Sequence, residues 1–339
     1  MKTSKKCGTL VAALAALSCS SIAHASTSSV KLYGLIDMGL AYERNSGESR
    51  LGLKDGVQSG SRWGLQGVED LGDGYRVVFR LESGFHPTTG KQAQGSDRIF
   101  GRWAYMGLAG GFGEVRLGRQ QVLSDSWGGV ASPFGTGWSG AAASVTSGFN
   151  DGDFGSSGRV NNAVIYTTPT FNGWQAGLGY SFEAHDSTQF ETANHDRVWT
   201  AGLRYMKGPL SAALTYERLN ADSSEPAKMN ASNLQLAGVY DFEWMKLHAG
   251  YGLLRNPNVG PSAGFKRINS FVGGASFPVG GSGRVLGSYQ RATSSNIKGW
   301  AMGYQYDLSK RTNLYALLDR VDRRETHVLQ TIVGMRHLF

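Results

Sequence analysis

The last residues of the chain alternate in character right up to the terminal residue. One row is mostly apolar and consists of Leu329, Thr331, Val333, Met335, His337 and Phe339. The other row is mixed and carries the charge of Arg336. A period of two places the rows on opposite faces of a strand. Because the apolar row suits a lipid surface, the ending predicts the closing strand of an outer-membrane β-barrel; an edge strand of a secreted sandwich is the alternative.

The start of the chain has the pattern of a secretory signal. Three lysines precede a short apolar stretch at 8–17, and Ala23-His24-Ala25 forms an A-x-A cleavage site. We therefore predict a signal peptide at residues 1–25 and a mature β-barrel domain at residues 26–339. A lipoprotein signal modified at Cys19 is the weaker alternative, because Ala16 stands where leucine is usual.

Composition narrows the class of protein further. Cleavage would remove both cysteines and three lysines, so the formal charge falls from +8 to +8 − 3 = +5, and no thiol remains for a disulfide or a metal. No Lys/Arg-rich run occurs, which argues against a nucleic-acid partner. Mean hydropathy is −0.27, and no mature stretch approaches the roughly 18 apolar residues of a membrane helix. A membrane protein of this composition must cross as strands.

Alternating segments recur along the whole mature chain. The clearest follows the turn at Asp70–Gly74, with Tyr75, Val77, Phe79 and Leu81 on one face and Arg76, Arg80 and Glu82 on the other. Sixteen predicted strands lie at 30–42, 62–67, 75–82, 98–108, 114–120, 162–168, 174–182, 197–206, 211–219, 234–242, 246–254, 266–277, 284–291, 299–306, 312–319 and 328–339. Short connections alternate with long polar ones such as 44–60, 220–230 and 256–264. The fold class is therefore all-β, an antiparallel transmembrane barrel of about 16 strands.

Aromatic residues lie near many predicted strand ends, where the girdles of a membrane barrel place them. This set includes Tyr33, Trp63, Tyr75, Trp103, Trp199 and Tyr315. We expect these rings to face outward. Aromatic residues favour strands in any protein, so the pattern supports the barrel without proving it.

The longest connection runs from Val122 to about Gly158, is rich in Gly, Ser and Ala, and contains Pro133-Phe134-Gly135. A connection of this length usually has a function. With this loop, the chain resembles the Gram-negative general-diffusion porins and is most similar to their anion-preferring, trimeric branch. The matching segments are 30–37, 61–70, 102–108, 113–120, the Pro133-Phe134-Gly135 loop and the ending 334–339.

The resemblance implies a homotrimer of 16-stranded barrels in the outer membrane, each narrowed by an inward-folded loop at about 122–158. Opposite that loop, it implies a constriction ladder made by Arg62, Arg102 and Arg159. Strand parity agrees for two of them, since Arg62 is out of phase with Trp63 and Arg102 with Trp103. Secondary lumen candidates are Arg76, Arg80, Arg98, Asp125, Pro133 and Phe134. The terminal Phe339 is expected to serve as an assembly signal.

The loop departs from the cation-preferring relatives in its charge. It reads Ser132-Pro133-Phe134 where those relatives carry a glutamate, and its acids, Asp125, Asp151 and Asp153, lie at its ends. A weak negative side opposite intact arginines predicts passive diffusion of small hydrophilic solutes, with anions preferred over cations and neutral solutes also admitted. Lipid and lipopolysaccharide are the other expected partners.

Other functions find less support in the sequence. The histidines show no metal-ligand spacing, and no hydrolase, P-loop or dinucleotide motif occurs, so we expect no metal, no cofactor and no enzyme activity. An outer-membrane barrel enzyme could use His185-Asp186 or His195-Asp196, which lie near one predicted loop. A substrate-specific sugar channel would need an aromatic path in the lumen. An adhesive barrel would fill its lumen with balanced charge pairs.

Overall fold

The computed structural model describes residues 28–339 except 96, 140, 142–157, 185–194, 225–226 and 259–262, so the predicted signal at 1–25 lies outside the described residues. The strands are β1 (Ser29–Asn45), β2 (Glu48–Asp55), β3 (Arg62–Gly72), β4 (Tyr75–His86), β5 (Lys91–Gln92), β6 (Trp103–Gly110), β7 (Gly113–Gln121), β8 (Arg159–Thr167), β9 (Trp174–Ser181), β10 (Arg197–Lys207), β11 (Leu210–Asn220), β12 (Ala231–Asp241), β13 (Lys246–Arg255), β14 (Arg267–Val279), β15 (Gly283–Ala292), β16 (Ile297–Asp307), β17 (Thr312–Arg323) and β18 (Thr326–Leu338). The helices are α1 (Leu123–Trp127) and the 3-10 turn η1 (Gly128–Ala131).

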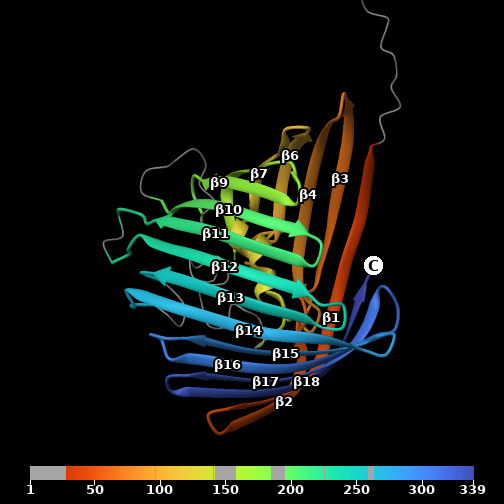
Figure 1. The fold of residues 1–339 in the computed structure, drawn as a ribbon, viewed down its shortest axis with the longest axis vertical. Coiled ribbons are helices and arrows are strands. Elements are labelled where there is room, and N and C mark those ends of the chain that lie inside the picture. The colour runs from red at the N-terminus through yellow and green to blue at the C-terminus, as the bar shows by residue number, and fades with distance from the viewer. Residues whose placement is uncertain are drawn as a thin grey trace, which may run out of the picture.

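The strands close into one antiparallel barrel (Figure 1). β1 pairs with β18 over Leu35–Asn45, which joins the two ends of the sheet. β2 and β3 lie end to end along β1, against Met38–Asn45 and Ser29–Leu35 respectively, so together they form one interrupted barrel strand. The two-residue β5 pairs only with β4, at the loop rim. The barrel therefore has 16 strands, as predicted.

Two predicted boundaries are wrong. The predicted loop at 44–60 contains β2, in which Leu51 and Leu53 face outward between Arg50 and Lys54. The strand predicted at 98–108 begins only at Trp103. The chain turns before that point, because Gly95 has a φ of +104° and Gly101 lies tightly against Gln94. Arg98 therefore lies in the connection between β5 and β6 and not on a barrel strand.

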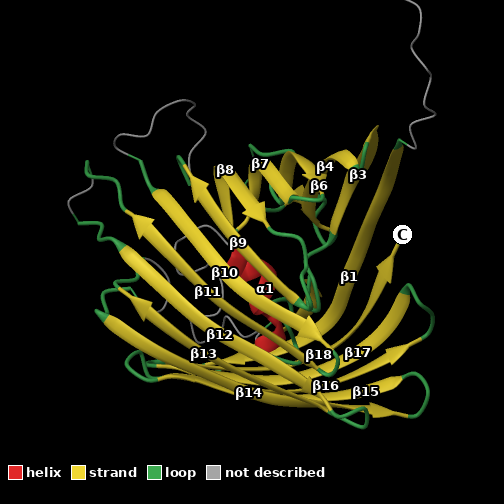
Figure 2. Ribbon diagram, turned by 45° about the horizontal axis from the view of Figure 1, so that its top comes forward, coloured by secondary structure: helices red, strands yellow, loops and turns green. Residues whose placement is uncertain are grey.

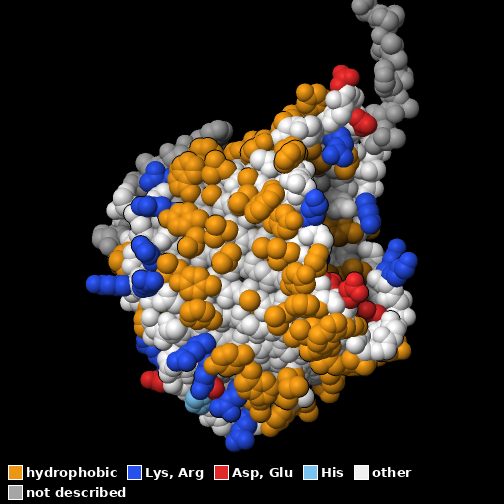
Figure 3. Space-filling view, in the orientation of Figure 1, with side chains coloured by type: hydrophobic (Ala, Val, Ile, Leu, Met, Phe, Trp, Pro, Cys, Tyr) orange, Lys and Arg blue, Asp and Glu red, His pale blue; other side chains and the backbone are white. Residues whose placement is uncertain are grey.

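The outer face of the barrel is apolar. Figure 3 shows apolar side chains spread over the strands of one face, with most Lys and Arg near its edges. The predicted outward row of β18 is confirmed, since Val333, Met335 and Phe339 are all exposed. Phe339 also exchanges two backbone hydrogen bonds with Gly34 of β1, of 3.0 and 3.1 Å, so the terminal residue takes part in closing the barrel. No helix in the described part of the chain is long and apolar enough to cross a membrane.

Three of the predicted girdle aromatics face the lumen instead. Tyr33 shares its strand face with Asp37, and its hydroxyl reaches the buried Glu82. Trp103 and Tyr315 are buried inside the barrel, where Tyr315 donates to Asp37. The outward prediction was wrong for these rings because aromatic residues occur on both faces of a strand, and the phase of each strand decides which face they occupy. The phase argument for Arg102, which took Trp103 as outward, is wrong for the same reason, since Arg102 precedes the start of β6.

The long connection after β7 folds into the barrel, as Figure 2 shows for its red helices. The backbone N–H of Leu123 donates to Thr200 Oγ1 at 3.0 Å, and that of Ser124 donates to Glu217 Oε1 at 2.9 Å. These bonds satisfy two of the N–H groups that a helix start leaves without partners. The wall strands β10 and β11 therefore hold the start of α1.

The rest of the described loop packs against further strands of the wall, including β13 and β16. Phe134 is buried beside Trp138, with ring centroids 5.3 Å apart, and its ring lies close to Gly303 of β16. His248 Nδ1 lies 2.9 Å from the carbonyl oxygen of Val130. The predicted inward fold is thus confirmed for residues 122–139, whereas Asp151 and Asp153 lie outside the described residues.

Candidate functional site

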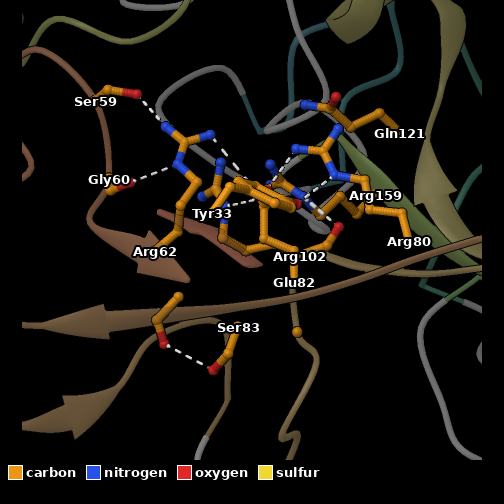
Figure 4. Close-up of polar contacts among 12 residues, drawn as sticks. Tyr33, Ser59, Gly60, Arg62, Arg80, Glu82, Ser83, Arg102, Gln121 and Arg159 are labelled. Atoms are coloured by element: carbon orange, nitrogen blue, oxygen red, sulfur yellow. Dashed lines mark hydrogen bonds and ion pairs between the residues drawn. The ribbon is translucent and has the colours of Figure 1, made fainter. Parts of the chain in front are cut away.

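One carboxylate on the lumen wall contacts three arginine side chains. Glu82 of β4 is fully buried. Its Oε1 accepts a hydrogen bond from Arg102 Nε at 2.6 Å and lies 3.9 Å from Arg62 Nη1. Its Oε2 accepts from Arg80 Nη2 at 2.5 Å and from the Tyr33 hydroxyl at 2.7 Å (Figure 4). We call Arg62, Arg80, Arg102 and Arg159 together with Glu82 the arginine cluster.

Strand register brings the members of the arginine cluster together. Glu82 lies opposite Gly64 on β3 and opposite Trp103 on β6, so it is next to the starts of both neighbouring strands. A Cβ at Gly64 would lie 2.8 Å from the Tyr33 hydroxyl oxygen. The glycine therefore leaves the space through which the Tyr33 hydroxyl passes over β3 to reach Glu82.

Arg159 completes the cluster from the start of β8. Its Nε donates to the backbone oxygen of Arg102 at 2.9 Å. The structure thus gathers all three predicted ladder residues, and it adds Arg80, which the sequence placed among the secondary candidates. Four guanidinium groups against one carboxylate leave 4 − 1 = +3 charges. An excess of positive charge at one place on the wall favours anions there over cations.

A short segment between β2 and β3 orients Arg62. The buried carboxylate of Asp37 accepts from the backbone N–H groups of Gln58 at 2.6 Å and Ser59 at 2.7 Å. Ser59 Oγ in turn accepts from Arg62 Nη2, and Gly60 O accepts from Arg62 Nε at 2.9 Å. Asp37 therefore acts on the cluster through the backbone of residues 58–60.

The same segment contacts the tip of the inward loop. The N–H of Ser139 donates to Val57 O at 2.7 Å. Val57 and Trp138 are both buried in one apolar cluster with Tyr315, whose hydroxyl donates to Asp37 at 2.6 Å. The loop tip and the Arg62 side chain are thus held by one connected set of contacts.

Asp125 is the one acidic residue in the described part of the loop from 122 to 139. It lies in α1 and accepts a hydrogen bond from Gln121 Nε2. Burial raises the pKa of its carboxyl, while the charges of Arg159 and Arg102 oppose that shift. Asp125 is therefore close enough to offset part of the positive charge of the cluster.

The other predicted residues lie elsewhere. Arg76 is exposed on β4 near the short turns, and Arg98 lies in the connection before β6. Pro133 packs close to Gly274 on the wall, and Phe134 is buried. These two loop residues anchor the loop rather than line an open passage.

Sequence reasoning assigned no role to Glu82, Tyr33 or Asp37. Parity did place Glu82 on the inward face of its strand, so a charged inward residue beside Arg80 was the available signal. The outward position predicted for Tyr33 is wrong, and no local pattern points to Asp37, because its partners are 21 to 278 residues away in the chain.

The described residues give little support to a catalytic site at the loop rim. Asp196 pairs with Lys228 Nζ at 2.6 Å and accepts from the N–H of Asp222 at 2.9 Å. His185 and Asp186 lie outside the described residues. Within the described ranges, no group of three or more His, Cys, Asp or Glu side chains is arranged to hold a metal.

Comparison with known proteins identifies the family. The Gram-negative porin family matches residues 10–326. An outer membrane porin protein of Bordetella pertussis is 38% identical over 91% of this chain and 92% of its own length. Outer membrane porin protein 32 of Delftia acidovorans is 35% identical over 94% of this chain and 90% of its own length. The solved anion-selective porin from Comamonas acidovorans is 30% identical, with a TM-score of 0.75 over 92% of this chain and 100% of that one. This chain belongs to the Gram-negative porin family and is an outer-membrane β-barrel channel protein.

Proposed function

We propose that this porin lets small hydrophilic solutes diffuse passively and prefers anions, and that Arg62, Arg102 and Arg159, joined by Arg80, set the preference. The observation that carries the proposal is the net charge of +3 on the arginine cluster, beside a described loop that holds one acid. The similarity to an anion-selective porin supports it. On this proposal the chain is a passive channel and not an enzyme.

The expected electrostatic free energy between the arginine cluster and a passing anion is large enough for selectivity but too small for tight binding. A unit charge about 7 Å from a passing ion contributes roughly 0.6 kcal/mol at the dielectric constant of water. Three net charges therefore favour an anion by about 2 kcal/mol before salt screening, which is more than tenfold in local occupancy. Screening weakens the preference as ionic strength rises.

Two observations weigh against the rival channels. In the lumen, the Tyr33 hydroxyl donates to Glu82 and the Tyr315 hydroxyl donates to Asp37. Trp103 is buried under Arg80. These rings therefore do not form an open path for sugars. An adhesive barrel would balance its inner charges, whereas the arginine cluster contains four arginines and one carboxylate. We further infer a homotrimer in lipid, in keeping with the family, after removal of residues 1–25.

The test is a double charge reversal. Replacing Arg102 and Arg159 with Glu changes the charge of the cluster from +3 to 3 − 4 = −1, so the reversal potential in a salt gradient should change sign. Arg284→Glu is the control, because Arg284 lies on β15, outside the cluster. Sedimentation in detergent should show the same trimer for all three proteins, since lumen changes tune selectivity more than stability. A wild-type channel that selects cations at low salt would refute the proposal.

A further inference from the structure

A second basic site lies between α1 and the short turns of the barrel. A cavity of about 390 Å³ there is lined by Arg76 of β4, Arg116 of β7 and Arg204 of β10, with Trp127 of α1. The one acid on its lining is Glu114. Three guanidinium groups against one carboxylate leave 3 − 1 = +2 charges around this cavity, which we call the turn-side cavity.

Two of these arginines are held in fixed positions by neighbours. Arg204 Nε donates to Gln175 Oε1 at 2.7 Å, and its Cζ lies 4.9 Å from the Trp127 ring centroid. Arg116 Nε donates to Glu114, and its Cζ lies 5.2 Å from the Tyr105 ring centroid. Among the residues that the structure describes, no hydrogen bond occupies the Nη groups of either arginine. Such a fixed guanidinium fork matches two oxygens of a carboxylate, phosphate or sulfate.

The turn-side cavity is connected to the arginine cluster by a row of aromatic contacts. The Cζ of Arg80 lies 5.0 Å from the Trp103 ring, and the Trp103 and Tyr105 rings are 5.6 Å apart. Tyr105 then contacts Arg116. On the other side, Gln121 lines the cavity and pairs in register with Arg159. An anion that leaves the arginine cluster toward the short turns therefore meets the second set of arginines next.

We propose that the turn-side cavity is a separate binding site for small divalent anions, through which the channel's anionic solutes pass in a second step. The charge of +2 matches a divalent anion better than a monovalent one, and the volume is that of a small-ligand site. Trp127 ties the site to the inward loop, because the same ring orients Arg204. The proposal rests on the proposed anion preference but concerns a different set of residues.

Inorganic sulfate is the probe, because it stays divalent across the neutral pH range. The whole channel is reconstituted in a planar bilayer, and chloride current is measured while sulfate is added to each side in turn at low ionic strength. Sulfate should reduce the current, with a lower half-blocking concentration from the short-turn side. Arg116→Gln and Arg204→Gln should each raise that concentration about tenfold, equivalent to roughly 1.4 kcal/mol. Arg284→Gln, which removes the same charge from β15 outside the cavity, should leave it unchanged.

Arg76→Gln is a second variant of the turn-side cavity, chosen because it should not affect folding. Its side chain is exposed and makes no hydrogen bond or ion pair within the described residues, so the barrel should assemble normally and the half-blocking concentration should rise about threefold. The inference is overturned if wild type shows no sulfate block, or if the turn-side variants block like wild type. A block that only Arg102→Gln removes would place sulfate at the arginine cluster and also overturn it. The sign of the chloride reversal potential, read in the same recordings, tests the proposed function separately.

Discussion

Glu82→Gln is the most informative single change, because the Glu82 carboxylate accepts hydrogen bonds from Arg80 and Arg102 and lies 3.9 Å from Arg62. Glutamine has nearly the same shape and keeps an acceptor oxygen for Arg102 at the Oε1 position, now 2.6 Å from Arg102 Nε. It places an amide where Oε2 accepts from Arg80 and Tyr33. The substitution therefore removes the negative charge and disturbs one side of the network, while the backbone register stays in place.

The expected size of the effect follows from the charge count. The cluster changes from +3 to +4, and one further charge at about 7 Å is worth roughly 0.6 kcal/mol at the dielectric constant of water. That amount raises anion occupancy about threefold and lowers cation occupancy by a similar factor. The anion-to-cation permeability ratio should thus rise about sevenfold at very low salt, and about threefold near 0.1 M, where screening halves the interaction.

The assay is the reversal potential of single channels in a potassium chloride gradient at several ionic strengths. Glu43→Gln is the matched control, because Glu43 is an acid of β1 whose partner is Lys54, at 3.9 Å, and not an arginine of the cluster. The control should change the permeability ratio less than Glu82→Gln does. We also expect a lower melting temperature for Glu82→Gln, since the buried Arg102 loses its charged partner. An unchanged or reduced anion preference in a correctly assembled Glu82→Gln channel would refute the reasoning.

Two further predictions concern the loop and the closure of the barrel. Deleting residues 132–139 removes the buried contacts of Phe134 and Trp138 with the wall, so single-channel conductance should increase; an unchanged conductance would contradict the placement of the loop. Gly34→Ala should lower the melting temperature and the yield of folded barrel, because its Cβ would lie 2.3 Å from the Phe339 ring, whereas Gly52→Ala, with no atom within 4 Å, should behave as wild type. Equal stability of the two glycine variants in thermal melts would show that the Phe339 ring does not need this position.

The amino-acid sequence by itself determined the membrane-facing architecture. A lipid-exposed strand must alternate apolar and polar side chains, so the outward row of β18 and the number of strands could be predicted from local periodicity. The same periodicity placed Arg62, Arg80 and Glu82 on inward faces. It failed for Tyr33, Trp103 and Tyr315, because an aromatic ring is compatible with either face and only the phase of its strand is decisive.

The tertiary structure decided which inward residues meet. The contact of Tyr33 with Glu82 depends on the register of β1, β3 and β4, and the contacts of Asp37 depend on a segment that leaves the sheet between β2 and β3. Arg116 and Arg204 become neighbours of one cavity only because α1 folds inward and Trp127 packs on Arg204. A period of two fixes the face of a side chain, but its position around the barrel and its partners depend on strand register and loop packing, which join residues far apart in the chain.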